Sequence, residues 1–343
     1  MKILRMRTDR RVLMGVLVIA FAVLASACSS SSEEVVTVYS GRSEKLIGPI
    51  LDAFTEDTGI KVEVRYGQSA DLALLIEQEG DKSPADVFIS QSPGAMGYLK
   101  QIGALQTLPA ETLALVPTEY ENADGQWVGV SGRVRVLVYN TDLVDPADLP
   151  ATVYDLVDER YRGAVGVAPA NGSFQDFVTA LRTTDGDDAA LSWLKGLVAN
   201  DAQIYAKNSA IVQAVGRGEV PMGLVNHYYN YRALVENSSL PTENYFFSEG
   251  DMGSLVIVTT AGIVGDGSDQ KDAASRLVAW LLGEKAQLFL QDTFEYPLAI
   301  GVEANPELPV FADLEAATYD LDQLGGGLTR TKELIDESGL EGP

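Results

Sequence analysis

The residue types best suited to chemistry lie in one stretch, Asn226–Tyr231, which carries three tyrosines in four residues directly after the apolar run Met222–Val225. An apolar strand followed by a polar, aromatic helix start is where open α/β sheets bind their ligands. Phenol oxygens are hard donors. Once deprotonated, they suit a hard, highly charged cation better than zinc or copper(I), which favour imidazole and sulfur. The alternative is that the rings only pack against neighbouring structure, with their hydroxyls hydrated or bonded to backbone.

Helix geometry alone leaves the choice among these tyrosines open. Adjacent residues on a regular helix diverge by about 100°, so Tyr228 and Tyr229 can bind one ion only at a helix start or on irregular backbone. Tyr228 and Tyr231 share a helix face, which makes Tyr231 the rival ligand. His227 is the sole histidine and is at best a single ligand. We expect it to cap the helix or to face solvent.

Three further polar clusters follow predicted strands at helix starts, namely Ser40–Ser43, Asn171–Ser173 and Asn208–Ser209. Helix N-termini present unpaired N–H groups and hold anions, although serine and asparagine there also serve as ordinary N-caps. Together with Asn226, the clusters fall at the same edge of the predicted sheets. A shared cleft is therefore favoured over four unrelated caps.

The N-terminus has the pattern of an export signal. It begins with a basic segment, continues with the apolar segment Val12–Leu24 and ends with the small residues Ala25–Ala27. The apolar run is shorter than a membrane-spanning helix needs. We therefore predict a signal peptide over residues 1–27.

Cys28, the sole cysteine, follows this segment at once, so an internal disulfide is excluded. Its placement resembles the lipobox of bacterial lipoproteins, in which this cysteine is lipidated, although Leu24 lies one residue before the usual leucine. We predict lipidation of Cys28 and a solvated tether over residues 28–34. The alternative is ordinary cleavage that leaves a free cysteine.

Composition bounds the rest of the chain. The 343 residues are 46% hydrophobic, which is enough for two ordinary domains with ample core. The formal net charge is −24, and the expected leader is basic, so the mature chain is more acidic still. Nucleic acid and anionic lipid headgroups are disfavoured as partners, because they require basic patches.

Strand-like and helix-like segments alternate along the mature chain. The predicted strands are 35–39, 60–64, 85–89, 133–139, 163–167, 202–205, 222–225 and 254–260. The predicted helices are 46–54, 72–79, 174–181, 191–198, 211–215, 273–290 and 328–338. This rhythm predicts the α/β class, with mixed, mainly parallel sheets flanked by helices. Two successive sets of this kind predict two lobes, with the chain crossing between them more than once.

Taken together, these segments resemble the ferric-iron-binding components of bacterial ABC importers, the ferric-binding-protein or bacterial-transferrin group. The resemblance extends from about Val35 to Pro297. It rests on the tyrosine pair and on the ordered motifs Thr37–Arg42, Phe54–Val62, Glu79–Phe88, Ser131–Tyr139, Tyr205–Ser209 and Phe294–Pro297. It implies a two-lobed periplasmic-binding-protein fold that closes over Fe(III). We place lobe 1 over residues 35–132 and 259–305, and lobe 2 over residues 133–258 and 306–343.

The resemblance also implies site residues. The family's adjacent tyrosine ligands match Tyr228 and Tyr229, which favours this pair over Tyr231. In many members an anion such as phosphate or carbonate completes the coordination, and the positions that hold it match Asn171, Gly172, Ser173, Asn208 and Asn226.

Two ligands that the family carries are missing from this sequence. The histidine found in many members falls on Ser43, and the family's glutamate falls on Ala70. Glu44 is the nearest hard oxygen donor that could complete the site. Arg42 and Arg133 are candidate counter-charges to the anion or the phenolates, or else partners in surface or structural ion pairs.

The function implied by the resemblance is not enzymatic. A monomer, lipid-anchored to the outer face of the cytoplasmic membrane, would deliver iron to an ABC permease. The first alternative is a solute-binding protein for a small organic or oxyanion ligand. An enzyme on the same fold is the second, but Gly-x-Ser-x-Gly, Walker-loop and His-Glu-x-x-His motifs are absent from the sequence. Nucleophilic catalysis would also lack a base beside its nucleophile.

Overall fold

The computed structural model describes residues 34–265, 271–317, 319–324 and 327–340. Contacts within the chain separate Met1–Glu34 from Val35–Pro343, and every element named below belongs to the second part. The predicted signal peptide and Cys28 lie outside the described residues. Within the described ranges, no helix reaches the length and apolarity that a membrane span requires.

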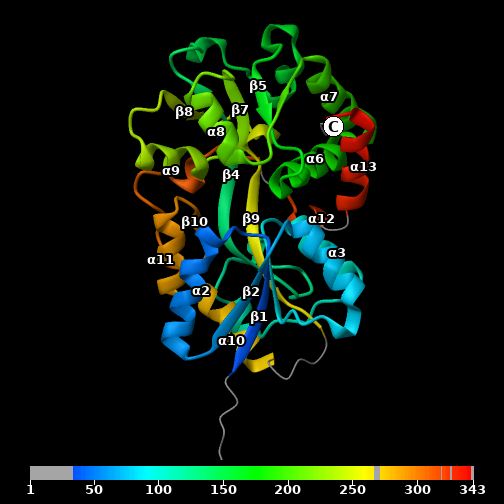
Figure 1. The fold of residues 1–343 in the computed structure, drawn as a ribbon, viewed down its shortest axis with the longest axis vertical. Helices are drawn as coiled ribbons and strands as arrows, with labels where there is room; N and C mark the ends of the chain where they lie inside the picture. Colours follow the sequence, from blue (N-terminus) through cyan, green and yellow to red (C-terminus); the bar gives the residue numbers. More distant parts are fainter. Residues whose placement is uncertain (1–33, 266–270, 318, 325–326, 341–343) are drawn as a thin grey trace, which may run out of the picture. The chain divides into compact units, whose positions relative to one another are not determined.

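The strands of the described chain form one mixed sheet in the order β2-β1-β3-β9-β4-β7-β5-β6, with β8 and β10 also paired to β4. β1 pairs in parallel with β2 and β3, and β5 pairs in parallel with β6 and β7. The two parallel groups are joined by the antiparallel strands β4 and β9 (Figure 1). The strand bounds are β1 Val35–Ser40, β2 Lys61–Tyr66, β3 Val87–Ser90, β4 Val128–Asn140, β5 Val165–Val167, β6 Gln203–Ile204, β7 Met222–Asn226, β8 Thr242–Tyr245, β9 Val256–Ile263 and β10 Tyr296–Pro297.

Strand β4 is 13 residues long and buried throughout. Up to Val134 it pairs with β9, and from Arg135 onward it pairs with β7 and then β8. Because side chains alternate along a strand, Arg133 and Arg135 lie on the same face. This one strand therefore presents two arginines where its pairing partners change.

The helices cover the sheet and follow the strand ends. Their bounds are α2 Glu44–Thr58, α3 Ser69–Glu79, α4 Pro93–Gln101, α5 Ala110–Leu113, α6 Gly172–Asp185, α7 Asp187–Ala199, α8 Asn208–Gly216, α9 Tyr228–Glu236, α10 Lys271–Leu281, α11 Glu284–Asp292, α12 Leu321–Leu324 and α13 Leu328–Ser338. In α2 the apolar side chains expected at helical spacing are buried. The helix ends at Gly59, whose φ of 73° favours glycine.

The predicted α/β class is confirmed, and most predicted elements lie within a few residues of their expected bounds. The single helix predicted over 273–290 is wrong, because two helices, α10 and α11, occupy this span. Gly283 separates them with an extended backbone (φ −75°, ψ 155°), and glycine is a poor helix former. The lobe boundaries stay a prediction.

Gln287 in α11 is fully buried and joins this helix to β4 and to the chain after β10. Its side-chain nitrogen donates to the carbonyl oxygens of Val130 (3.0 Å) and Leu281 (2.8 Å). Its side-chain oxygen accepts from the N–H groups of Leu298 (2.9 Å) and Ala299 (3.1 Å). One side chain thus satisfies four backbone groups.

We predict that Gln287→Leu lowers the free energy of unfolding by about 3 kcal/mol or more, because each buried polar group left unpaired costs about 1–3 kcal/mol. Urea denaturation at neutral pH measures the change. The control is Gln101→Leu at the exposed end of α4, for which we expect a change within about 0.5 kcal/mol. Equal stability of the two variants would show that the Gln287 bonds do not hold this part of the fold.

Candidate functional site

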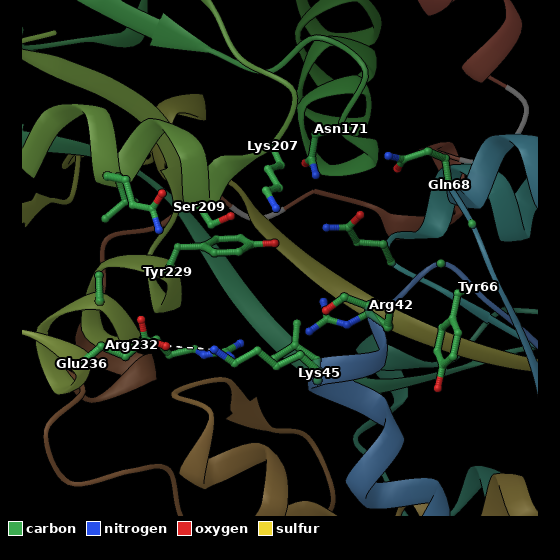
Figure 2. A pocket seen from close by; sticks show the side chains of 18 residues that line it. Arg42, Lys45, Tyr66, Gln68, Asn171, Lys207, Ser209, Tyr229, Arg232 and Glu236 are labelled. Carbon is green, nitrogen blue, oxygen red and sulfur yellow. Dashed lines mark hydrogen bonds and ion pairs between the residues drawn. The ribbon is translucent and has the colours of Figure 1, made fainter. Parts of the chain in front are cut away.

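A cavity of about 510 Å³ opens where several helix starts meet. Its walls come from the β1–α2 connection, the residue that caps α6, the segment that enters α8, and α9. In Figure 2 the side chains of Tyr229 and Lys207 extend into the cavity, and the hydroxyl of Tyr66 points away from it. The shared cleft expected from the polar clusters is therefore present.

Tyr228 and Tyr229 are the first two residues of α9, directly after β7 and His227. Their rings stack with centroids 4.3 Å apart and an interplanar angle of 29°. Tyr228 is fully buried, and among the described residues its hydroxyl has no hydrogen-bond partner. Tyr229 is half-buried and lines the cavity. Adjacent tyrosines approach each other here because they lie at a helix start, as the sequence required, and the Tyr228 hydroxyl is available to a further partner.

The pKa of Tyr229 is raised well above its usual value, chiefly by burial and further by Tyr228, while Arg42 and Arg133 lower it. The phenol is therefore protonated at neutral pH unless a cation stabilises the phenolate. Metal binding through this oxygen would release a proton, and acid would oppose it.

Arg42 lies between β1 and α2 and is 3% exposed. It forms an ion pair with the fully buried Glu295, which also accepts a hydrogen bond from the Ser131 hydroxyl (2.6 Å). Burial opposes the charged form of Arg42, yet Glu295, Tyr228 and Tyr229 raise its pKa above the usual value. The guanidinium carbon lies 5.7 Å from the centre of the Tyr228 ring. Arg42 is thus a buried cation at the site and not a surface charge.

Arg133 and Arg135 on β4 are also buried. Arg133 donates through Nε to the Ser173 hydroxyl (3.2 Å) and through Nη1 to the Thr259 hydroxyl (2.9 Å). Arg135 donates through Nη1 to Asn226 Oδ1 (3.4 Å), and burial with Arg133 nearby lowers its pKa to about 9. Arg135 is not among the residues predicted from the sequence, although its i, i+2 spacing from Arg133 on a predicted strand indicates that the two side chains share a face.

Several donors in this buried group have no hydrogen-bond partner in the residues that the structure describes. They are Arg42 Nη1, Arg133 Nη2, and Arg135 Nε and Nη2. Buried N–H groups are almost always paired, and charged donors bind carboxylate or phosphate oxygens best. The arrangement is suited to an anion beside the two phenols.

Three of the predicted anion-binding residues, Asn171, Ser173 and Asn226, form part of the same network. Asn171 caps α6 by accepting the Ser173 N–H (3.1 Å), and Gly172 begins that helix. The Ser173 hydroxyl also accepts from Asn226 Nδ2 (3.2 Å). Asn208, at the start of α8, is fully buried, and within the described part of the chain neither its side-chain oxygen nor its side-chain nitrogen has a partner. The structure thus joins Asn171, Ser173 and Asn226 directly and leaves Asn208 unpaired.

Of the candidate metal- and anion-binding residues, only Arg42, Asn171 and Tyr229 line the cavity; outside its lining lie Tyr228, Arg133, Gly172, Ser173, Asn208, Asn226, Glu44 and Tyr231. Glu44 is exposed at the start of α2, although its neighbours Ser43 and Lys45 line the cavity. Tyr231 stacks on Phe294 with centroids 5.5 Å apart and an interplanar angle of 14°. Of the two rival tyrosines, only Tyr229 lines the cavity.

The expectation that His227 faces solvent is wrong, and although the residue occupies the N-cap position of α9, its side chain makes no capping hydrogen bond. The ring is fully buried. Its Nδ1 accepts from the Val134 N–H (3.1 Å), and its Nε2 lies 2.8 Å from the Phe294 carbonyl oxygen, which fixes Nε2 as the donor. Burial lowers the pKa of His227 to about 4. The ring is therefore neutral at ordinary pH, and it fixes the turn that precedes the tyrosines.

Comparison with known proteins shows the family to which this chain belongs. The family model described as bacterial extracellular solute-binding protein matches residues 82–320. The chain is 33% identical over 318 residues to an Fe(3+)-binding periplasmic protein of Serratia marcescens, a match that covers 92% of this chain and 93% of the relative. The chain therefore belongs to the bacterial extracellular solute-binding proteins.

Two solved structures identify the group within that family. Iron-bound HitA from Pseudomonas aeruginosa has a TM-score of 0.85 and 35% identity, and the match covers 89% of this chain and 99% of that one. A Trichodesmium structure in complex with iron and citrate has a TM-score of 0.75 and 27% identity, with coverage of 90% and 100%. The two-lobed fold and the assignment to the ferric-binding-protein group are thus confirmed. Proteins of this family are the extracytoplasmic substrate-binding components of ABC importers.

Asp176 is a buried acid one helical turn after Ser173. Its Oδ2 accepts from the Gly94 N–H (3.3 Å) at the start of α4. Burial raises the pKa of Asp176 to about 7, although hydrogen bonds from Ser92 and Gly94 act in the opposite direction. The carboxyl therefore takes up a proton in the folded protein at a much higher pH than in the unfolded chain.

We predict a pH-dependent stability difference between wild type and Asp176→Asn. An unfolded aspartate has a pKa of about 3.9, so between about pH 4 and pH 7 the folded state binds a proton that the unfolded state releases. The stability contributed by this carboxyl is present below pH 4 and is lost as pH rises towards 7. Asp176→Asn should gain on the order of 3–4 kcal/mol over wild type across this range, measured by urea denaturation. Exposed Asp188→Asn controls for net charge. A pH-independent difference for Asp176→Asn would contradict the prediction.

Proposed function

We propose that this chain is the ferric-iron-binding component of an ABC importer and that it has no enzymatic activity. The observation that carries the proposal is the stacked pair Tyr228 and Tyr229, with an unpartnered phenol beside buried arginines. Fe(III) is a hard, highly charged cation that suits phenolate oxygen. In this proposal iron is the cargo, and the protein releases it unchanged.

In the proposed complex, Tyr228 and Tyr229 supply phenolates and an anion of the phosphate or carbonate type completes the coordination. That anion faces the unpartnered arginine nitrogens and the polar helix starts. The proposed anion-binding residues are Arg42, Arg133, Asn171, Gly172, Ser173, Asn208 and Asn226. The missing family ligands at Ser43 and Ala70 make the anion's own oxygens more important here. Glu44 as a third protein ligand stays a prediction, and its exposed side chain would have to turn towards the cavity.

The alternative of a small organic or oxyanion ligand bound without iron is not favoured. Such a ligand could occupy the arginines, but it would leave the buried Tyr228 hydroxyl without a charged partner. The relatives compared above are also ferric-iron-binding proteins.

The cellular arrangement follows from the N-terminal sequence pattern. We propose a monomer anchored through lipidated Cys28 to the outer face of the cytoplasmic membrane. From there it would present iron to the permease, and the solvated segment over residues 28–34 would allow it to reach that partner.

We expect Tyr228→Phe and Tyr229→Phe each to weaken Fe(III) binding at least about 100-fold, because each removes both a ligand atom and a negative charge. A competition titration against a chelator of known affinity measures the effect, and circular dichroism checks the fold. Tyr231→Phe is the matched control and should bind as wild type. Wild-type affinity in Tyr229→Phe would remove that residue from the site. Glu44→Gln in the same titration decides the third ligand, since an unchanged affinity excludes it.

We also expect Fe(III) to favour a closed form. The cavity is lined by Arg42 from predicted lobe 1 and by Asn171 and Tyr229 from predicted lobe 2. A cargo that contacts both lobes binds the closed state more tightly and shifts the population towards it. Small-angle scattering should show a smaller radius of gyration with iron, and Tyr229→Phe should show no such change. An identical radius for wild type with and without iron would contradict closure.

A further inference from the structure

The sole histidine of the chain lies at the residue where strand β7 becomes helix α9. Asn226 ends β7 and Tyr228 begins α9, and His227 between them already has helical backbone angles (φ −51°, ψ −43°). Its N–H still donates to the Val134 carbonyl oxygen (3.0 Å), which continues the pairing of β7 with β4 by one residue. Its own carbonyl oxygen accepts from Asn244 Nδ2 (2.9 Å). The Val134 N–H therefore takes a different acceptor, because a buried N–H group is almost always paired.

That acceptor is the imidazole ring of His227, which also holds a second segment of the chain. Nδ1 accepts from the Val134 N–H (3.1 Å), and Nε2 donates to the Phe294 carbonyl oxygen (2.8 Å). A neutral imidazole carries one donor and one acceptor on different sides of the ring. The ring is fully buried, and its centroid lies 5.9 Å from that of the Tyr228 ring and 5.1 Å from that of the Tyr296 ring. One side chain thus joins the start of α9 to β4 and to the residues before β10.

The segment held through Phe294 is the one that holds the buried arginine of the site. Glu295 forms the ion pair with Arg42, and the Phe294 ring stacks on Tyr231 in α9. In the predicted division of the chain, Phe294, Glu295 and Arg42 belong to lobe 1, whereas α9 belongs to lobe 2. A shift of the Phe294–Glu295 segment relative to α9 would therefore reach the tyrosine pair through His227.

We propose that His227 is a positioning residue that couples the orientation of Tyr228 and Tyr229 to the Phe294–Glu295 segment. While the ring bonds Phe294, the start of α9 is held and the two phenols are aligned for a metal ion. Loss of that bond leaves the turn before the tyrosines supported from β4 alone. Hydrogen bonds to groups outside the metal's own ligands orient those ligands in other metal sites. This inference rests on the proposed function and adds to it a link between the metal ligands and the opposite predicted lobe.

Two substitutions separate the two bonds of the ring. The amide of His227→Asn extends only as far as Nδ1 and can keep the Val134 bond, whereas that of His227→Gln extends as far as Nε2 and can keep the Phe294 bond. We expect His227→Asn to weaken Fe(III) binding between about tenfold and 100-fold and to shift the visible tyrosinate–iron absorption band. His227→Gln should recover most of the affinity and the wild-type band. A chelator competition titration and absorption spectra of the whole mature protein, at one neutral pH, measure both effects.

The matched control removes a buried amide far along the chain from the tyrosines. Asn200, which follows α7, is buried and donates to the carbonyl oxygens of Leu156 (3.4 Å) and Asp158 (2.6 Å). Asn200→Leu should lower stability in urea denaturation and leave the iron affinity and the absorption band as in wild type. A loss of stability alone therefore does not produce the result expected for His227→Asn.

A second measurement uses the wild-type protein and does not depend on any variant folding. Because His227 is the only histidine in the sequence, isotope-labelled histidine in protein without a histidine tag gives ring signals from this residue alone. Ga(III) serves as the probe, as a diamagnetic trivalent cation that also suits hard oxygen donors. We expect the Nε2–H proton to exchange slowly in the Ga(III)-loaded protein, and its exchange rate and nitrogen chemical shift to change when the metal is removed.

An unchanged affinity and absorption band in His227→Asn would overturn the inference and leave the proposed function intact. An equal loss in His227→Gln and His227→Asn would also overturn it, because the Phe294 bond would then make no difference. If the variants do not fold, the ring signals decide, and identical signals with and without Ga(III) would overturn the inference. Failure of wild type to bind Fe(III) would overturn the proposed function, and the inference with it.

Discussion

The buried ion pair between Arg42 and Glu295 is the interaction on which the rest of the site depends. Burying a guanidinium is costly unless a carboxylate and further hydrogen bonds compensate for lost water. Glu295 compensates Arg42, but the hydrogen-bond partners of Arg133 and Arg135 among the described residues are neutral hydroxyl and amide groups. The fold therefore buries positively charged guanidinium groups beside two phenols. Their charge is offset only when phenolates and an anion are present, that is, when the site holds its ligands.

One short segment couples this ion pair to the tyrosine helix. Phe294 has a φ of 62°, which is uncommon for a bulky residue and marks a position fixed by its surroundings. Its carbonyl oxygen accepts from His227, and its ring stacks on Tyr231. The next residue, Glu295, holds Arg42. Phe294 contacts the start of α9 and Glu295 holds Arg42, so these two adjacent residues link the tyrosine helix to the Arg42 side chain.

The sequence predicted much of the fold because its cues are local. Apolar spacing identified α2, and Gly59 marked its end. The helix predicted over 273–290 failed because apolar periodicity continues through Gly283, whose extended backbone interrupts the helix. At the candidate site, helix geometry left Tyr231 as a rival ligand, and the resemblance to the ferric-binding group was needed to select Tyr228 and Tyr229. Glu295 could not be assigned a role, because its partner Arg42 lies 253 residues away in the chain. For the same reason, the burial of His227 between Val134 and Phe294 was not foreseen.

The central claim is that phenolate oxygens of Tyr228 and Tyr229 bind ferric iron. Resonance Raman spectroscopy of the iron-loaded protein, excited within its visible absorption band, tests this directly. The account predicts a coloured protein whose spectrum shows tyrosinate ring modes, reduced in Tyr228→Phe and in Tyr229→Phe and unchanged in Tyr231→Phe. Stoichiometric iron binding without tyrosinate modes would contradict it.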